Sequence, residues 1–465
     1  MEARIGGGMS VSDLQGAPRS TSEQGTEPES KLPRGSVTRK TLVSASGVVL
    51  MQGAAMVIGF ATAVVLARRL ETVGYGRYVF ALAWTSVLAI PAILGLDRFL
   101  VRGIAVYEVG GEWGLMKGLL RRTNQLVMAT ALAIAATGCV VANVWLSPEL
   151  RWPFCVAMLF IPLNTLTVIR QGAMQAIGRV VSGQLPEYVI RPALTLVGIG
   201  ILAALGHHAL GATSALGANI VGVAVAFVVG AALLRRALPP VLNSVRPEYA
   251  TRDWVRAALP MMLISGVWMA NNYCTTLVVG TIDGPRAVGV YSVVQKGAEL
   301  IVVLLVAANM PLAPLVARAY ARADLAELEH VTERVAQAAF VVSLPIGVGL
   351  ALFPMTYLGI FGSGFQVGAT ALVTLALAQL VNAVAGPAGN VLLMTGHERA
   401  AVKGVALGLV ANLLLAVALV PPFGVTGGAI AFATSLVLWN AALVVIARRS
   451  VGVNVTAIRA LSLRR

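Results

Sequence analysis

Long apolar runs alternate with short polar segments along most of this chain. A helix that crosses a bilayer needs about 20 mostly apolar residues, and runs of that order recur throughout the sequence. We place twelve of them at 42–67, 76–97, 123–146, 152–172, 188–206, 210–234, 256–281, 288–314, 335–353, 368–394, 402–421 and 424–447. The pattern therefore predicts an all-α polytopic membrane protein with 12 transmembrane helices.

Polar segments at both ends and in the middle divide the chain. Residues 1–41 are rich in Gly, Ser, Pro and Glu and lack an apolar stretch, so we expect a disordered cytoplasmic tail and no signal peptide. Residues 235–255 contain Pro239-Pro240 and several charges, which predicts a cytoplasmic linker between two groups of six spans. The expected division is 1–41, an N-terminal lobe at 42–234, the linker at 235–255, a C-terminal lobe at 256–447 and a basic cytoplasmic tail at 448–465.

Composition supports the membrane assignment. The 465 residues are 57% hydrophobic and only 12% charged, whereas soluble proteins carry about twice that charge. The mean hydropathy is +0.82. The three cysteines, Cys139, Cys155 and Cys274, lie in apolar runs without a CxxC spacing, so we interpret them as packing residues.

The distribution of basic residues predicts the orientation. With the N-terminus inside, 29 of the 35 Lys and Arg residues fall in inner segments and five in outer loops, with Arg170 and Arg191 counted in the inner loop between the fourth and fifth spans. Cytoplasmic loops are enriched in Lys and Arg, so we expect both termini on the cytoplasmic side of the inner membrane. The net charge of +15 is explained by these basic residues, which we expect to face anionic lipid headgroups. The sequence lacks the combination of basic and aromatic residues that nucleic-acid-binding modules use, so we expect no nucleic-acid partner.

Short motifs recur at nearly one offset. Gly76 corresponds to Gly289 at an offset of 213, and Gly178 corresponds to Gly396 at an offset of 218. The offset divides the chain into two halves of six spans, and an even number of spans gives both halves the same orientation. We therefore expect two six-helix bundles related by pseudo-two-fold symmetry about an axis along the membrane normal.

Two charges stand out because the pattern places them well inside an apolar run. Lys296 and Glu299 lie at i and i+3, on one helix face. A charge at the centre of a membrane helix costs about 2.5–3.5 kcal/mol on the insertion scale, so each should face a cavity or a partner. Either the two form an internal pair, or Lys296 meets a lipid pyrophosphate or acidic sugar while Glu299 tunes it or binds a coupling cation.

The repeat also predicts where this pair lies relative to the two halves. At an offset of 213, Lys296 and Glu299 match Ala83 and Ser86, which carry no charge. We therefore predict that Lys296 faces the space between the two halves, and that a cavity there takes its charge from one half only.

Other polar residues are candidates for the translocation path. Asn271 and Asn272 lie in the middle of the seventh run, where amides either bridge helices or contact a sugar. Asp97 and Arg98 lie at the inner end of the second run. They could form a gate, contact a lipid headgroup or form an interfacial ion pair. The chain has no P-loop, HExxH or GxSxG motif, which predicts neither an enzyme nor a bound cofactor or metal.

Several short motifs carry a resemblance to a known group of transporters. They are Leu66-Ala67-Arg68-Arg69-Leu70, Gly74-Tyr75-Gly76-Arg77-Tyr78, Leu94-Gly95-Leu96-Asp97-Arg98 and Met394-Thr395-Gly396-His397. Over about residues 38–450 the chain resembles the oligosaccharide flippases of the multidrug/oligosaccharidyl-lipid/polysaccharide exporter superfamily, close to the O-antigen flippase and polysaccharide biosynthesis group.

This resemblance implies a V-shaped pair of bundles around a central cavity. It implies alternating access that moves a polyprenyl-pyrophosphate-linked oligosaccharide across the cytoplasmic membrane, driven by an ion gradient or the membrane potential. Implied partners are the lipid-linked oligosaccharide, membrane lipids and a glycan polymerase or glycosyltransferase assembly. Two alternatives stay open: an ion-coupled exporter of drugs or small cations in the same superfamily, and a scaffold subunit without transport activity.

Overall fold

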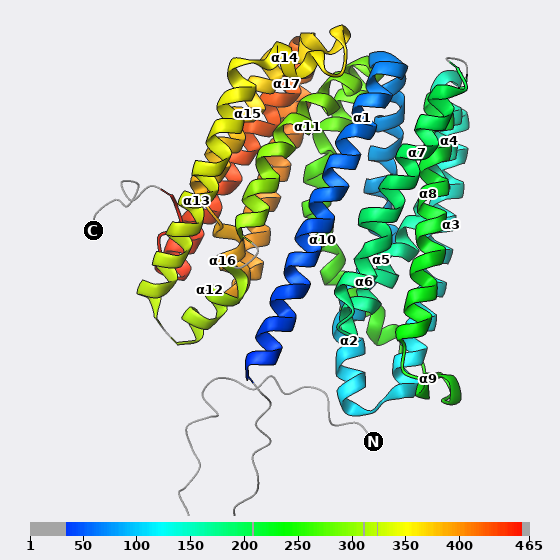
Figure 1. Ribbon diagram of the computed structural model, residues 1–465, viewed down its shortest axis with the longest axis vertical. Helices are drawn as coiled ribbons and strands as arrows, with labels where there is room; N and C mark the ends of the chain where they lie inside the picture. The colour runs from blue at the N-terminus through cyan, green and yellow to red at the C-terminus, as the bar shows by residue number, and fades with distance from the viewer. Residues whose placement is uncertain (1–33, 207–208, 310–311, 323, 458–465) are drawn as a thin grey trace, which may run out of the picture. The chain divides into compact units, whose positions relative to one another are not determined.

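The computed structural model describes residues 34–206, 209–309, 312–322 and 324–457, which form helices and no strand (Figure 1). The chain divides into two units, Met1–Val43 and Ser44–Arg465, and the second unit holds the candidate site. Most of the tail expected at 1–41 lies outside the described residues, and the first helix begins at Arg34.

The first half contains two long helices and several shorter ones. The first helix, α1, covers the first two expected spans and is interrupted at Glu71, whose φ of 56° and ψ of −170° are not helical. The elements of this half are α1 (Arg34–Ile93), α2 (Leu96–Gly110), α3 (Trp113–Trp145), α4 (Pro148–Met158), α5 (Phe160–Ala176), α6 (Val180–Leu185), the π-helical turn η2 (Pro186–Ile190), α7 (Arg191–Ala204) and α8 (Ala212–Ala237). The linker holds one short helix, α9 (Val241–Ser244).

The second half follows a similar plan. Its last helix, α17, covers the last two expected spans and is interrupted at Gly424, with φ 53° and ψ −131°. The elements are α10 (Thr251–Ile282), α11 (Gly284–Asn309), α12 (Leu312–Ala321), α13 (Leu325–Leu352), α14 (Pro354–Gly359), the 3₁₀ turn η3 (Ser363–Gly368), α15 (Ala369–Ala385), α16 (Ala388–Met394) and α17 (Glu398–Ser450).

Eight segments among the described residues are long and apolar enough to cross a membrane. Two of them, Leu50–Ile93 with 44 residues and Glu398–Ser450 with 53 residues, are much longer than one crossing needs. Each contains one of the two backbone breaks described above. The all-α membrane class is thus confirmed, whereas the number of twelve crossings stays a prediction.

The internal repeat is visible in the backbone. Glu71 and Gly284, which correspond at the offset of 213, both have positive φ, 56° and 84°. Gly178 and Gly396 also have positive φ, 72° and 80°. The amide that follows each of these two glycines donates to a carbonyl five residues earlier, at 2.8 Å and 2.9 Å, as in a Schellman C-cap. Corresponding helices of the two halves therefore end in the same way.

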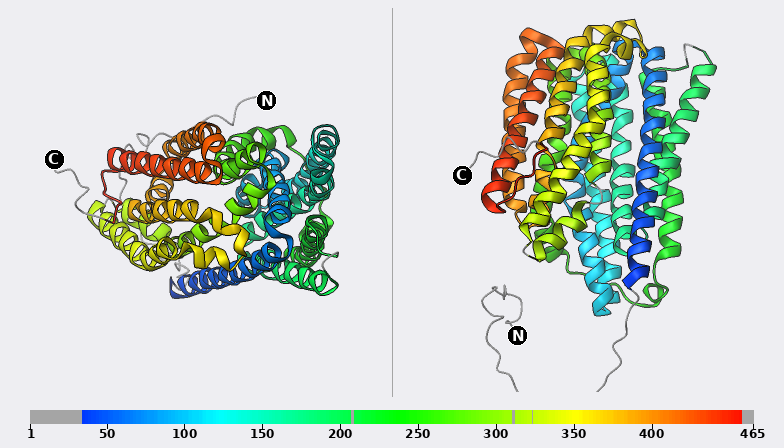
Figure 2. Two further views of the ribbon diagram at one scale, coloured as in Figure 1. Left: turned by 90° about the horizontal axis from the view of Figure 1, so that it is seen from above. Right: turned by 60° about the vertical axis from the view of Figure 1, so that its left-hand side comes forward.

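Two groups of helices flank three central ones. Helices α13, α15 and α17 lie on one side, α3, α7 and α8 on the other, and α1, α10 and α11 between them (Figures 1 and 2). Within the halves, α15 packs against α13 and α17, and α8 packs against α5 and α7. Between the halves, α2 packs against α10.

The halves also meet where two glycines allow close backbone approach. A Cβ placed on Gly76 would lie 1.7 Å from the carbonyl oxygen of Pro285, and one placed on Gly289 would lie 2.1 Å from that of Thr72. Small residues at helix interfaces permit such approach in membranes. Beside this contact, Arg68 Nε donates to the carbonyl oxygen of Ile360 at 2.7 Å. The two halves are therefore firmly packed at this end.

Candidate functional site

A cavity of about 770 Å³ lies between the two halves. The first half lines it with residues of α1, α5, η2, α7 and α8, and the second half with residues of α10, α11, α15 and α17. Ligand cavities commonly measure 300–1,000 Å³. The cavity is therefore large enough to hold part of a sizeable amphipathic molecule.

Lys296 and Glu299 of α11 both line this cavity. Lys296 Nζ lies 2.6 Å from Glu299 Oε2, and the two side chains remain 39% and 45% exposed. Residues of both halves share the cavity with them, so Lys296 occupies the space in which the sequence analysis placed it. Its part in transport stays a prediction.

A second ion pair enters the same cavity from the first half, between Glu187 and Arg191. Their side chains are 18% and 22% exposed, less than those of the α11 pair. The expectation that charge comes from one half only is therefore wrong. The positive-inside pattern led us to count Arg191 as an inner-loop residue, whereas in the structure it begins helix α7 and faces the cavity.

The local chain explains how Arg191 comes to face the cavity. Pro186 begins the turn η2, and Pro192 follows Arg191 directly. Between them the Arg191 amide donates to the carbonyl oxygen of Pro186, five residues earlier, which is a π-helical bond. Such single π turns occur frequently at functional sites. The sequence signal that could have revealed this second pair is a Glu and an Arg at i and i+4 between two prolines.

Three neighbouring side chains hold Arg191 in place at the edge of the cavity. Its Nη1 pairs with Glu187, and its Nη2 donates to Asn219 Oδ1 at 3.4 Å. The guanidinium lies 4.8 Å from the centre of the Phe160 ring. Asn219 Nδ2 in turn donates to the hydroxyl of Tyr78 at 3.0 Å. The guanidinium is thus fixed in orientation, as recognition of a phosphate or carboxylate requires.

The rest of the lining is rich in hydroxyl, amide and aromatic groups. The polar and aromatic members are Thr62, Tyr75, Tyr78, Ser86, Phe160, Tyr188, Thr195, Asn219, Asn272, Tyr273, Thr276, Ser292, Gln295, Gln379 and Phe432. Hydroxyl and amide groups both donate and accept hydrogen bonds. A wall of this kind can bind a polyhydroxylated ligand, while one basic residue from each half can bind an anionic group.

The two neighbouring asparagines have different environments. Asn272 lines the cavity. Asn271 is buried, and its Oδ1 accepts from Asn412 Nδ2 at 3.5 Å. The Oδ1 of Asn412 accepts a 2.8 Å hydrogen bond from the Thr275 hydroxyl. Asn271 therefore links α10 to α17, and only Asn272 is placed to contact a ligand.

Asp97 and Arg98 lie away from the cavity, at the start of α2. Arg98 Nε lies 3.9 Å from Asp97 Oδ2, and the Arg98 side chain is 72% exposed. The structure thus does not bring these two residues together with Lys296 and Glu299. Their proposed role as a gate stays a prediction.

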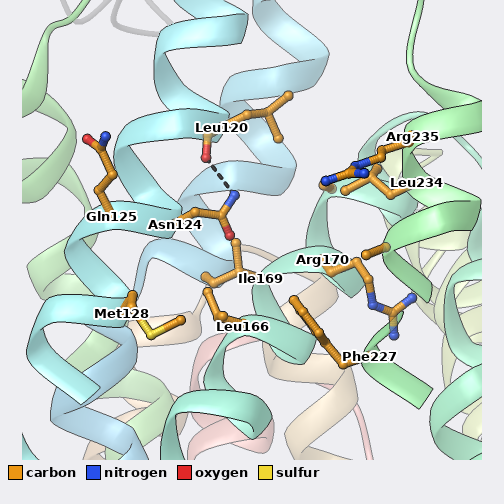
Figure 3. A pocket seen from close by; sticks show the side chains of 12 residues that line it. Leu120, Asn124, Gln125, Met128, Leu166, Ile169, Arg170, Phe227, Leu234 and Arg235 are labelled. Carbon is orange, nitrogen blue, oxygen red and sulfur yellow. Dashed lines mark hydrogen bonds between the residues drawn. The ribbon is translucent and has the colours of Figure 1, made fainter. Parts of the chain in front are cut away.

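A smaller cavity of about 460 Å³ lies within the first half, between α3, α5 and α8. Figure 3 shows mainly apolar walls, with Arg235 near one edge and Asn124 donating to the carbonyl oxygen of Leu120. Arg170 lines this cavity, but its guanidinium points away from Asn124 and Met128 on the opposite wall (Figure 3). Sequence reasoning missed Arg170 as well, because it counted this residue as part of an inner loop.

Among the described residues, no group of three or more His, Cys, Asp or Glu side chains could hold a metal ion. The lining of the cavity between the halves offers ion pairs, hydrogen-bonding groups and aromatic faces.

Solved structures with this arrangement of helices are transporters. An inward-facing multidrug resistance MATE family transporter of the MOP superfamily matches with a TM-score of 0.71 and 16% identity, over 88% of this chain and 98% of that chain. An outward-facing MATE family transporter matches with a TM-score of 0.59 and 15% identity, over 88% and 95%. The lipid II flippase MurJ, in an inward closed conformation, matches with a TM-score of 0.65 and 11% identity, over 88% and 87%.

The chain thus shares its fold with solved transporters of the MOP superfamily. A family model described as polysaccharide biosynthesis protein matches residues 41–320, more than half of the chain, and the chain belongs to this family. The MatE family model matches residues 260–418. Comparison with curated proteins gives no match.

Proposed function

We propose that this transporter flips a polyprenyl-pyrophosphate-linked oligosaccharide across the cytoplasmic membrane for surface polysaccharide biosynthesis. One observation carries the proposal: the cavity between the halves contains a basic residue from each half, Arg191 and Lys296, among hydroxyl, amide and aromatic side chains. Arginine and lysine bind phosphate oxygens, and the neutral polar groups suit a sugar. Membership in the polysaccharide biosynthesis family supports this substrate class.

Alternating access would use the contact between the halves as one of its two gates. The end at Gly76 and Gly289 is packed, and with both termini inside it is the outer end. We propose that the described conformation is inward-facing, which the TM-scores of 0.71 and 0.59 to the inward-facing and outward-facing transporters support. The substrate would enter from the cytoplasmic leaflet and leave after this contact opens.

The test is deletion of the gene followed by complementation, with surface polysaccharide and drug sensitivity as readouts. The proposal expects loss of polysaccharide and accumulation of inward-facing lipid-linked units after deletion. Wild-type protein should restore polysaccharide, whereas the double variant Arg191→Ala/Lys296→Ala should not. Intact polysaccharide after deletion would contradict the proposal.

A second candidate is an ion-coupled exporter of cationic drugs, which the MatE match and two cavity carboxylates favour. A cationic substrate would depend on Glu187 and Glu299, while an anionic one would depend on Arg191 and Lys296. Drug sensitivity after deletion, with a transporter that tolerates Arg191→Ala and Lys296→Ala but fails with Glu299→Gln, would favour the exporter. A scaffold subunit would tolerate all of these changes, provided that each variant is inserted.

A further inference from the structure

Arg170 is a buried arginine with an incomplete set of partners. Its side chain is 3% exposed, and Nη1 donates to the carbonyl oxygen of Gly183 at 3.2 Å. Nε and Nη2 are buried and have no hydrogen-bond partner among the described residues. Gly230 packs directly against the guanidinium, since a Cβ there would lie 2.2 Å from Arg170 Cζ. Buried polar groups without partners are rare and require an explanation.

Two acceptors in the adjoining segment also lack partners. Glu187 Oε2 and Gln184 Oε1 are buried and accept no hydrogen bond from a described residue. Segments α5 and α6 pack together, and α6 packs against η2. Glu187 is also the charged residue whose field acts on Arg170. Arg170 therefore has two donors without partners and packs beside a segment that holds two acceptors without partners.

Positive charges outnumber negative charges around Arg170. Arg170 and Arg191 are two cations, and among the described residues Glu187 is the carboxylate that pairs with Arg191 and whose charge also acts on Arg170. In the described conformation Glu187 Oε1 is bonded to Arg191 and Oε2 is free. A buried charge without a partner is destabilising, so Arg170 is a ready partner for Glu187 whenever another anion occupies Arg191.

We propose that Glu187 exchanges between these two arginines as the substrate binds and leaves. This inference rests on the proposed function. When a diphosphate group of the substrate reaches Arg191, it replaces the carboxylate there, because a diphosphate carries more negative charge and more acceptor oxygens. Glu187 then accepts from Nε and Nη2 of Arg170. Arg170 is thus a positioning residue, because it receives the carboxylate that the substrate displaces and does not touch the substrate.

The exchange explains why the cavity keeps a carboxylate beside a cation that has to bind an anion. With the substrate absent, Glu187 neutralises Arg191, and the charged side chains that line the cavity from the described part of the chain are all paired. With the substrate present, Arg170 prevents Glu187 from being left buried without a partner. Release of the substrate reverses both steps.

The test is a double-mutant cycle on equilibrium binding of farnesyl diphosphate to the purified full-length protein in nanodiscs. Arg170→Met should weaken binding about tenfold, because displaced Glu187 has no new partner. Glu187→Gln should strengthen binding, because no carboxylate competes at Arg191. In the Glu187→Gln background, Arg170→Met should have no further effect, since there is no carboxylate to receive. Arg170→Lys keeps the charge and should recover part of the affinity.

The outcomes separate this inference from the proposed function. Equal effects of Arg170→Met in both backgrounds would show a general structural role and overturn the exchange. Arg170→Lys as weak as Arg170→Met would also count against it. Unchanged affinity in Arg191→Ala would instead contradict anion binding in the cavity, and with it the proposed function. If Arg170→Met does not yield folded protein, the comparison of Arg170→Lys with and without Glu187→Gln gives the same cycle.

Discussion

Gly76 and Gly289 occupy equivalent positions in the two halves and lie against one another in the structure. The backbone nitrogen of Gly289 lies 2.9 Å from the position of a Cβ on Gly76, and that of Gly76 lies 3.2 Å from a Cβ on Gly289. A pair of equivalent residues in contact must lie close to the pseudo-two-fold axis. The contact between Gly76 and Gly289 that closes one end of the cavity therefore lies close to this axis.

An alanine at this contact should prevent the two halves from closing. Gly76→Ala introduces a methyl group 1.7 Å from the Pro285 carbonyl oxygen, so the helices must separate. We expect a lower midpoint of thermal unfolding and greater labelling, from the outer side, of a cysteine introduced in the cavity by Ser86→Cys. The control is Gly53→Ala, also in α1, where a Cβ meets nothing within 4 Å. Alanine favours a helix by about 0.8–1.0 kcal/mol over glycine, so the control should be neutral or stabilising. Equal behaviour of the two variants would contradict the tight contact.

The break in α1 should become less strained when its residue is glycine. Glu71 has φ 56° and ψ −170°, a region that only glycine adopts readily, and its repeat equivalent is Gly284. Such conformations cost about 1–3 kcal/mol in other residues. Glu71→Gly should therefore raise the midpoint of thermal unfolding, measured in detergent. Glu71→Ala removes the same carboxylate without relieving strain and should not; an equal gain in both would assign the effect to charge.

The two adjacent asparagines of α10 should differ in what they support. Asn271→Ala removes a partner of Asn412 between α10 and α17 and should lower stability by about 0.6 kcal/mol, the average measured for such bonds in membranes. Asn272→Ala should leave unfolding unchanged and weaken binding of the sugar portion of the substrate. Thermal unfolding and ligand binding of both variants check this. A loss of stability in Asn272→Ala alone would reverse the assignment.

A methyl group on α8 should reproduce the loss of Arg170. Gly230→Ala places a Cβ 2.2 Å from the Arg170 guanidinium and so displaces the guanidinium from its position in the structure. We expect weaker binding of farnesyl diphosphate, as in Arg170→Met. The matched control is Gly217→Ala, on the same helix, where a Cβ meets nothing within 4 Å. Wild-type affinity in Gly230→Ala would show that the position of Arg170 is unimportant.

The helical class and the two-fold repeat could be predicted from the sequence because both depend on regular patterns. Apolar runs of membrane length recur along the chain, and Gly76 and Gly289 mark the same position in each half. The breaks at Glu71 and Gly424 could not be predicted in the same way. They depend on packing between helices, which hydropathy alone does not describe.

The candidate site could be predicted only in part. Lys296 was found because it interrupts a long apolar run. Arg170 and Arg191 lie near the ends of their runs, where the positive-inside pattern assigns arginines to loops. Their burial depends on the π turn and on how α5, η2 and α8 pack together, and neither feature follows from hydropathy. The role of Asn271 likewise became clear only from its contact with Asn412.

Transport of a fluorescent polyprenyl-diphosphate oligosaccharide in proteoliposomes tests the central claim most directly. Arg191→Ala and Lys296→Ala should each slow flipping about tenfold, and the double variant should be inactive, because each removes a charge-assisted contact with the diphosphate. The control carries Arg179→Ala and Arg318→Ala, which remove exposed arginines outside the cavity, and it should flip at the wild-type rate. A folded Arg191→Ala/Lys296→Ala variant that flips as fast as wild type would contradict the account.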